Sequence, residues 1–227
     1  SVGIGSSQHL SGEYFSQVTG VKMTHVPYRY PMLSQPRPEY NGIVLHETFG
    51  NFAFAIAARV RELGAEIHAA YPAGEAIVLV SVLKGSLVFV ADLMRAIPRN
   101  VEIDLMEVSS YGGGSTESSG KVRILKDLSG SIEGRNVVIV EDIIDTGLTL
   151  SYLTTYLGGR NPRSVRIATL LNKPARRLVD IPVTWTGFEI PDEFVVGYGL
   201  DFGEHYRNLR YVGVLKRELY SSIIGGA

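Results

Sequence analysis

The sequence has no cysteine among its 227 residues. This absence excludes disulfide bonds, thiolate catalysis, and zinc or iron–sulfur sites with cysteine ligands. Long apolar runs are missing too, since none approaches the roughly 20 residues that span a bilayer, and the N-terminus shows no signal-peptide pattern. The chain also has no large excess of either charge, because it contains 22 basic and 23 acidic residues. We therefore expect a cytoplasmic protein with no general electrostatic affinity for nucleic acid or membrane.

The composition that is present fits one folded domain. Hydrophobic residues make up 45% of the chain and charged residues 20%, which is ordinary for a globular protein, and the length suffices for one well-buried core. Residues 1–40 contain many Ser, Gly, Pro, Gln and Tyr residues without sustained periodicity. We interpret them as a partly flexible N-terminal extension, and we place the folded domain at 41–227.

The hydrophobic pattern after residue 40 alternates between helical and strand periods. Phe52, Ile56, Val60 and Leu63 recur at helical spacing, whereas Val101–Val108 alternates apolar and polar residues like a half-buried strand. This order predicts an α/β domain with a mostly parallel central sheet flanked by helices, and a small hood subdomain from the C-terminal strands. The expected helices cover 50–70, 87–97 and a segment with Leu150, Leu153 and Leu157 on one face. The expected strands cover 77–83, 101–108, 122–125, 137–140, 165–171 and segments near 194–198 and 211–215.

The stretch Val137–Leu150, which reads VVIVEDIIDTGLTL, carries the most chemical information. Four β-branched residues run directly into Glu141 and Asp142, and Asp145 then opens a segment of Thr and Gly residues. The free N–H groups and the dipole of a helix N-terminus form a binding site for an anion. Acidic side chains beside such a site point to a phosphorylated sugar that is handled together with a metal ion.

This stretch resembles the phosphoribosyl pyrophosphate (PRPP) signature of the type I phosphoribosyltransferases. Other segments resemble the hypoxanthine-guanine branch of that family. They are VLKGS at 82–86, similar to a pyrophosphate loop; SSYG at 109–112, similar to the start of a mobile flap; and LLNKP at 170–174 and GFEIPDEFVVGY at 187–198, similar to purine-recognition elements. The resemblance extends from about 76 to 215 and implies the type I phosphoribosyltransferase fold.

The resemblance also implies a role for each candidate residue. The residues implied to hold the ribose and 5-phosphate of PRPP are Glu141, Asp142, Asp145, Thr146, Gly147, Leu148 and Thr149. Pyrophosphate would be bound by Lys84, Gly85 and Arg207, and the flap would close through Ser110 and Tyr111. The purine would be contacted by Lys173, Phe194, Val195 and Asp201. The metal would be held by Glu141, Asp142 and Asp201, and the catalytic residue beside purine N7 would be Asp145.

Several of these residues have a purely structural alternative. The Asp and Thr residues of the phosphate segment are also good helix N-caps, and the Glu141–Asp142 pair is compatible with a structural salt bridge. A lysine before proline, such as Lys173, is often a solvated surface residue, and a phenylalanine between strands, such as Phe194, is often part of a core. The sequence leaves open whether Asp145 accepts a proton or stabilises positive charge. We interpret the pair Arg176-Arg177 as solvated surface.

The implied activity is purine salvage: PRPP and hypoxanthine or guanine give IMP or GMP and pyrophosphate, with Mg²⁺ as cofactor. The implied partners are PRPP and a 6-oxopurine base, and the implied assembly is a homodimer or homotetramer. A xanthine-preferring or broad 6-oxopurine enzyme is an alternative in the same class. An RNA-binding regulator with a PRPP fold is an alternative of another class, but it should have a basic face, and this chain is near neutral. A haloacid-dehalogenase-type phosphatase needs Asp-x-Asp, whereas Asp142 and Asp145 lie three residues apart.

Overall fold

The structure is a computed structural model that describes residues 43–44, 52–110 and 122–224. The predicted extension at 1–40 and the loop at 111–120 lie outside these ranges. The helices are α3 (Phe52–Ala69), α4 (Leu87–Ala96), α5 (Leu148–Gly158) and α6 (Arg217–Ile224), with a 3₁₀ turn η3 (Pro174–Arg176). The strands are β1 (Ile43–Val44), β2 (Ile77–Leu83), β3 (Val101–Ser110), β4 (Val122–Lys126), β5 (Asn136–Ile144), β6 (Ser164–Asn172), β7 (Trp185–Glu189), β8 (Val195–Val196) and β9 (Gly213–Leu215).

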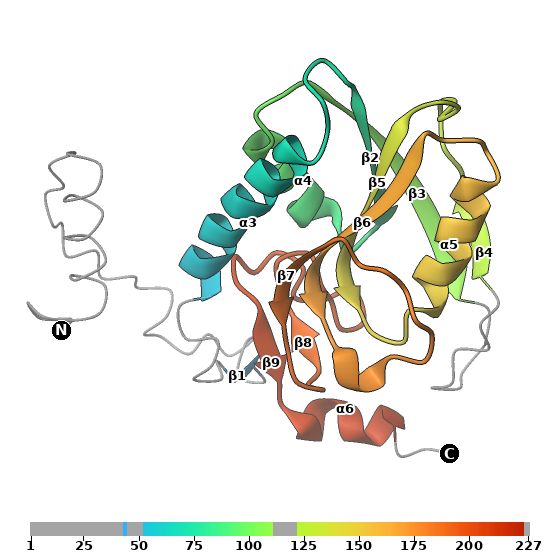
Figure 1. Cartoon of the computed structure of the whole chain (residues 1–227). Coiled ribbons are helices and arrows are strands. Elements are labelled where there is room, and N and C mark those ends of the chain that lie inside the picture. The colour runs from blue at the N-terminus through green and yellow to red at the C-terminus, as the bar shows by residue number, and fades with distance from the viewer. Residues whose placement is uncertain (1–42, 45–51, 111–121, 225–227) are drawn as a thin grey trace, which may run out of the picture. The chain divides into compact units, whose positions relative to one another are not determined.

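Six strands form one twisted sheet in the order β4-β3-β2-β5-β6-β7 (Figure 1). All neighbouring strands run parallel except β3 and β4, which pair antiparallel. The predicted mostly parallel sheet is therefore confirmed, as is the expectation that the segment after the flap loop pairs back on the chain. The central strands β2 and β5 are buried almost throughout, as their continuous β-branched sequences predict.

The helices cover both faces of this sheet (Figure 1). On one face α3 and α4 pack together, and the predicted helical stripe supplies Ile56, Val60 and Leu63 to the core. The two helices approach so closely that a Cβ at Gly64 would lie 2.5 Å from the carbonyl oxygen of Ala96. On the other face α5 buries the predicted leucines, which are Leu150, Leu153 and Leu157.

Strand β3 differs from its predicted pattern. The alternation of residues 101–108 suggested that Val101, Ile103 and Leu105 form the apolar face and that Met106 lies with the polar residues. In the structure Met106 is completely buried in the core beneath α5, whereas Ile103 is 41% exposed. The buried face therefore follows the even-numbered positions near the end of the strand, because α5 and the neighbouring strands cover that face there.

A second, smaller sheet of order β1-β9-β8 forms the predicted hood (Figure 1). Both of its pairings are antiparallel. Its C-terminal strands lie where the sequence predicted them, but β1 comes from the start of the domain and was not predicted. A two-residue strand has too little pattern of its own to be recognised. No helix within the described ranges is long and apolar enough to cross a membrane.

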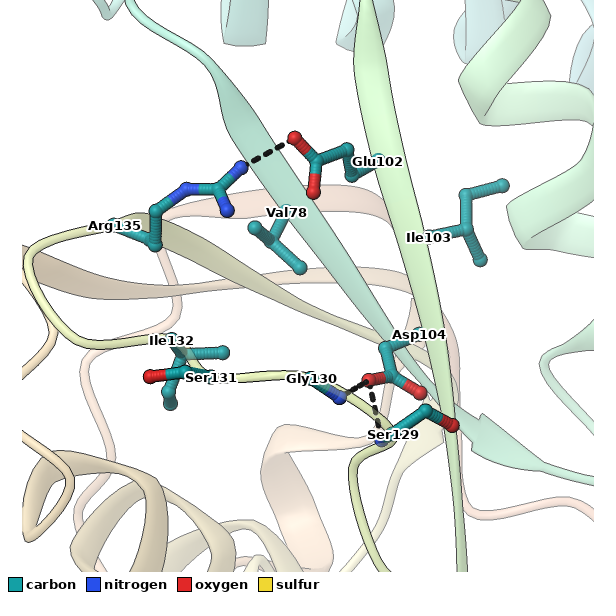
Figure 2. A pocket seen from close by; sticks show the side chains of 9 residues that line it. All are labelled: Val78, Glu102, Ile103, Asp104, Ser129, Gly130, Ser131, Ile132 and Arg135. Carbon is teal, nitrogen blue, oxygen red and sulfur yellow. Dashed lines mark hydrogen bonds and ion pairs between the residues drawn. The ribbon is translucent and has the colours of Figure 1, made fainter.

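A hollow of about 290 Å³ lies at the amino ends of the parallel strands (Figure 2). The polar groups around it are already paired: the Asp104 carboxylate accepts the N–H groups of Ser129 and Gly130, at 2.7 and 3.2 Å, and Arg135 forms an ion pair with Glu102 at 2.5 Å. Ligand sites in open parallel sheets lie at the opposite, carboxyl ends of the strands. The predicted site residues of the six-stranded sheet lie at those ends.

Candidate active site

Many of the predicted site residues lie where β2, β5 and β6 end, namely Lys84, Gly85, the segment 141–149 and Lys173. Phe194, Val195, Asp201 and Arg207 lie in or near β8 of the smaller sheet. The register of β5 and β6 sets Ile144 opposite Asn172, and the next residue, Lys173, donates its backbone N–H to the Ile144 carbonyl at 2.9 Å. The loop after β2 begins at Lys84, which follows a cis peptide bond. Because parallel strands end at one edge of the sheet, these three loops meet although their sequences lie far apart.

The loop after β5 leads into the N-terminus of α5 through Gly147. This residue is the N-cap of α5, with φ of 85°, a conformation that favours glycine. A Cβ there would lie 3.0 Å from Ile181 Cδ1 and 3.2 Å from Arg177 Nη1. The alternative of an ordinary Asp or Thr N-cap is therefore wrong, since the hydroxyl of Thr146 meets the N–H of Leu148 only at 3.5 Å. The first turn of α5 presents backbone N–H groups suited to an anion.

The two adjacent acids lie inside β5, which continues to Ile144 instead of ending before them. The buried Glu141 Oε2 atom has no hydrogen-bond partner among the described residues. Burial, followed by the neighbouring charge of Asp142, raises the pKa of Glu141 well above its usual value. Burial also raises the pKa of Asp142 to about 6, against the lowering effect of the Ile143 N–H and the Arg207 charge. Within the described residues the two carboxylates form no direct ion pair, and the charge of Arg207 compensates their burial only in part.

The acidic pair suits a hard divalent cation that arrives with a phosphorylated substrate. No three acidic or imidazole side chains in the described part of the chain form a metal cluster. Mg²⁺ commonly takes only one or two carboxylates and completes its shell with water and substrate phosphates, so the unsatisfied Glu141 Oε2 and the Asp142 carboxylate fit it. Asp201, the third predicted ligand, lies near enough for its charge to raise the pKa of Asp142.

The loop after β2 packs directly against Asp142. A Cβ at Gly85 would lie 1.7 Å from Asp142 Oδ2, so only glycine leaves room for that carboxylate. On the other side, a Cβ at Gly199 would lie 2.1 Å from the Gly85 carbonyl oxygen. The buried hydroxyls of Ser81 and Ser86 hydrogen-bond to each other at 2.7 Å and hold the base of the loop. The predicted metal and pyrophosphate residues are thus direct neighbours.

The two predicted pyrophosphate-binding cations share one carboxylate. Glu204 Oε1 lies 3.2 Å from Lys84 Nζ and 3.3 Å from Arg207 Nη2. Arg207 Nη2 also lies 2.9 Å from Asp201 Oδ1, and its Nη1 donates to the Gly199 carbonyl at 2.9 Å. The structure therefore brings Lys84 and Arg207 together. It places Asp201 with this charged group, so its predicted purine contact stays a prediction.

The predicted purine-reading lysine is buried. Only 8% of the Lys173 side chain is exposed, and its Nζ lies 3.8 Å from Asp192 Oδ1. Burial lowers the pKa of Lys173, and the charges of Asp145 and Asp192 oppose that change. The alternative of a solvated surface lysine is therefore wrong. A buried ammonium beside Asp145 is placed to read a polar ligand.

The predicted purine-stacking residue, Phe194, lies in an aromatic cluster. Its ring meets Phe202 edge-on at 5.6 Å and lies nearly parallel to Tyr220 of α6 at 5.1 Å. Phe194 is only half-buried, whereas Val195 is buried in β8 and pairs with Val214. The ring is held in place by aromatic neighbours, and its contact with a purine stays a prediction.

Of the predicted flap residues, the structure places only the backbone of Ser110. It is the last residue of β3 and pairs with Val122 of β4. Tyr111 lies outside the described residues.

Sequence reasoning missed three charged residues of the site, namely Arg176, Asp192 and Glu204. Arg176 is an exposed residue, as predicted. Its Nε also lies 2.9 Å from Asp145 Oδ1, a contact that the interpretation as solvated surface did not include. Arg177 is half-buried, donates to the Asn172 side chain and keeps its Nη1 atom buried beside Gly147. The interpretation of Arg177 as a solvated residue was wrong. The sequence did contain one indication that these arginines belong to the site: both follow closely after the predicted purine-binding residue Lys173.

The comparisons with known proteins agree with this geometry. The family model described as phosphoribosyl transferase domain matches residues 53–203. A hypoxanthine-guanine phosphoribosyltransferase of Streptococcus agalactiae is 55% identical over 166 residues, which cover 73% of this chain and 91% of the relative. The chain belongs to the hypoxanthine-guanine phosphoribosyltransferase family. The family resemblance drawn from the sequence is confirmed.

Solved structures of this family have the same fold. A hypoxanthine phosphoribosyltransferase from Staphylococcus aureus superposes with a TM-score of 0.75 at 46% identity, covering 82% of this chain and 98% of that one. The Trypanosoma cruzi hypoxanthine phosphoribosyltransferase in complex with the product IMP gives a TM-score of 0.69 at 42% identity, covering 74% and 94%. The predicted type I phosphoribosyltransferase fold is confirmed.

Proposed function

We propose that this chain is a purine-salvage enzyme that transfers the 5-phosphoribosyl group of PRPP to N9 of hypoxanthine or guanine, giving IMP or GMP and pyrophosphate. The names of its close relatives support this activity. The observation that carries the proposal is the acidic pair of β5. Asp142 contacts the glycine loop at Gly85, and the helix N-terminus at Gly147 follows the acidic pair by five residues in the chain. This supports binding of the pyrophosphate, ribose and phosphate of PRPP along one edge of the sheet.

The 5-phosphate of PRPP would lie at the N-terminus of α5. The backbone N–H groups from Thr146 to Thr149 and the two threonine hydroxyls offer donors to its oxygens, and the helix dipole favours its charge. Gly147 lets the phosphate approach the backbone. The buried Nη1 of Arg177 adds positive charge behind this loop. This arrangement binds a phosphate without a lysine on the loop.

The leaving pyrophosphate would lie between the acidic pair and the basic side chains. Glu141 and Asp142 would hold the ribose hydroxyls and Mg²⁺, which when bound supplies positive charge to the leaving group. Lys84 and Arg207 would turn from Glu204 to the pyrophosphate oxygens, where Arg offers two parallel N–H donors. The backbone N–H groups of the loop at Gly85 would complete this half of the site.

The purine would lie between Lys173 and the hood. The Lys173 ammonium would donate to O6 of an oxopurine, whereas the amino group of adenine would oppose one donor with another. A donor that is buried in this way discriminates strongly, because a ligand without the matching acceptor leaves it unpaired. Phe194 would stack on the ring, and backbone groups near Val195 would meet its edge.

In the reaction, the bond from C1 of the ribose to pyrophosphate breaks and its electron pair leaves with the pyrophosphate oxygen. The bond from N9 to C1 forms, and the proton on N7 is released. The Asp145 carboxylate would lie beside N7, where it meets either that proton or the positive charge that builds up on the base. The flap, with Ser110 and Tyr111, would exclude water from the oxocarbenium-like centre.

The experiment that tests the proposal measures pyrophosphate release from PRPP and Mg²⁺ with hypoxanthine, guanine, xanthine, adenine or uracil. We expect turnover with the oxopurines and none with adenine or uracil. A higher kcat/KM for xanthine than for hypoxanthine and guanine would replace the proposal by the xanthine-preferring alternative. Binding of PRPP without turnover of any base would favour the RNA-binding regulator. The cytoplasmic location and the homodimeric or homotetrameric assembly stay predictions, and the assembly is measured by light scattering.

A further inference from the structure

The side chain of Arg176 connects two carboxylates at the edge of the proposed base site. Its Nε lies 2.9 Å from Asp145 Oδ1, and its Nη1 lies 3.5 Å from Asp192 Oδ1. Arg176 ends the 3₁₀ turn η3, which begins at Pro174 directly after Lys173. Proline fixes one backbone dihedral of this short turn. The backbone that carries the Arg176 side chain is therefore restricted in conformation.

Asp192 also faces the buried lysine. Lys173 Nζ lies 3.8 Å from the same Asp192 Oδ1 atom that Arg176 approaches. The four side chains therefore alternate in charge in the order Asp145, Arg176, Asp192, Lys173. The two ends of this chain are the residues proposed to meet the base, Asp145 at N7 and Lys173 at O6. Its two middle members have no role in the proposed reaction so far.

The two ends of the chain interact with each other as well. Among the acidic groups that act on Lys173, Asp145 has the largest effect on its pKa. Backbone hydrogen bonds hold their segments side by side, since Lys173 N donates to Ile144 O at 2.9 Å and Leu178 N donates to Thr146 O at 3.0 Å. A carboxylate and an ammonium placed in this way tend to form a direct ion pair, which would occupy the groups that the base needs.

We propose that Arg176 is a positioning residue that keeps Asp145 and Lys173 apart. Its Nε lies 2.9 Å from the Asp145 carboxylate, and the Asp192 carboxylate that it also approaches lies 3.8 Å from the Lys173 ammonium. Each end of the chain therefore has a partner other than the opposite end. The base then enters between two polar groups that are already separated and oriented. The proposal rests on the proposed function, because it takes Asp145 and Lys173 as the groups that contact the purine.

Steady-state kinetics of Arg176→Met test the proposal. Without the guanidinium, Asp145 turns to Lys173 and the base must break that pair. We expect KM for hypoxanthine to rise by roughly threefold to fivefold, as for a partly exposed ion pair, while KM for PRPP stays within about twofold. Arg176→Lys keeps a cation and should recover most of the loss. The matched control is Arg163→Met, which removes an exposed arginine paired with Glu75 at 2.8 Å, just before the amino end of β6 and so at the edge of the sheet opposite to the site.

Asp192→Asn provides a second, independent variant. It should also raise KM for hypoxanthine, and the double variant with Arg176→Met should lose less than the sum of the two single losses, because both act through one chain of charges. Calorimetric titration with IMP should show weaker binding in both single variants. Thermal unfolding of each variant checks that the fold is retained.

The possible outcomes distinguish failure of the proposed function from failure of the positioning role of Arg176. If the wild-type protein does not turn over any oxopurine, the proposed function fails and this inference fails with it. If the wild type is active but Arg176→Met raises KM for PRPP and hypoxanthine equally, or lowers kcat alone, the positioning role is wrong while the function stands. A folded Arg176→Lys variant that is as impaired as Arg176→Met would also contradict it.

Discussion

At the scale of single residues, Asp145 combines exposure with a defined partner. Its side chain is 39% exposed, and its Oδ1 atom lies 2.9 Å from Arg176 Nε. It directly precedes Thr146 and Gly147, so it lies on the loop that we propose to bind the 5-phosphate. The Oδ1 atom itself is buried although the side chain as a whole is partly exposed, so the carboxylate is held in one place.

We predict that Asp145→Asn lowers kcat by about 10²-fold or more, the range expected for loss of a positioned acid–base group. KM for PRPP should change little, because the phosphate is bound mainly by the backbone N–H groups that follow. Steady-state kinetics with both substrates varied will measure the two constants. Equal losses in kcat and in PRPP affinity would show that Asp145 serves binding and would remove the catalytic assignment.

Gly85 is a position where adding a side chain would directly disturb the site. A Cβ there would lie 1.7 Å from Asp142 Oδ2, so Gly85→Ala must displace the carboxylate or the loop. We predict a rise of roughly tenfold or more in KM for PRPP, since both the loop and the acidic pair face the leaving group.

The control for this variant is Gly130→Ala. A Cβ at Gly130 meets nothing within 4 Å, and this residue has no positive φ. Its kinetic constants should equal those of the wild type. If Gly85→Ala keeps a wild-type KM for PRPP, the loop after β2 does not bind pyrophosphate and Lys84 loses its assignment as well.

At the scale of elements, the sequence predicted those helices and strands whose burial follows a local hydrophobic pattern. The continuous apolar strand β2 and the leucine stripe of α5 were predicted nearly to the residue, because burial on two faces or on one stripe leaves a clear periodicity. The phase of β3 was wrong, because both of its alternating sets contain apolar residues and only tertiary packing selects Met106. The motif residues were predicted from local sequence as well, and the structure brings Lys84, Gly85, Asp142 and Arg207 together, while their binding roles stay predictions.

The residues that were missed depend on distances between elements. Arg176 and Asp145 lie 31 positions apart, and Glu204 meets Lys84 across 120 positions. Ion pairs of this kind leave no periodic trace in a single sequence. The parallel register of β5 and β6, which sets Ile144 opposite Asn172, brings Arg176 to the loop that holds Asp145.

The contact between α3 and α4 gives a prediction at this scale. Gly64→Ala places a Cβ 2.5 Å from the backbone oxygen of Ala96, so the helices must separate. We expect a loss of about 1–3 kcal/mol in the free energy of unfolding, measured by chemical denaturation. Gly158→Ala in α5 is the matched control, since its Cβ meets nothing within 4 Å and alanine favours a helix. An unchanged stability of Gly64→Ala would mean that this close approach does not limit packing.

At the scale of the whole molecule, the acidic pair that we propose to bind Mg²⁺ and ribose opposes folding at neutral pH. The folded-state pKa values of Glu141 and Asp142 are raised, the second from 3.8 to about 6. The folded protein therefore holds more protons than the unfolded chain above about pH 4. Stability from these groups is fully present below the unfolded pKa values and is lost as the pH rises through the folded ones. A bound cation with PRPP would restore it.

Glu141→Gln tests this balance across the whole fold. The variant removes one buried charge and relieves its effect on the Asp142 carboxylate, so it should unfold at a higher temperature than the wild type at pH 8. We expect a gain of roughly 2–8 °C in Tm there and almost none at pH 4, where the wild-type carboxyls are protonated when folded. Thermal unfolding at several pH values measures the difference, with the exposed Glu133→Gln as control.

The same variant should bind Mg²⁺ and PRPP more weakly, which separates stability from function. A Tm difference that is equal at pH 4 and pH 8 would show that the charge of Glu141 has no part in it, and that its carboxylate is compensated in the free protein. A pH-dependent gain together with weaker PRPP binding would show that the buried charges are kept for the substrate. The instability of the free site is then the reason that substrate binding stabilises the fold, because the cation and the ribose hydroxyls supply the partners that β5 lacks.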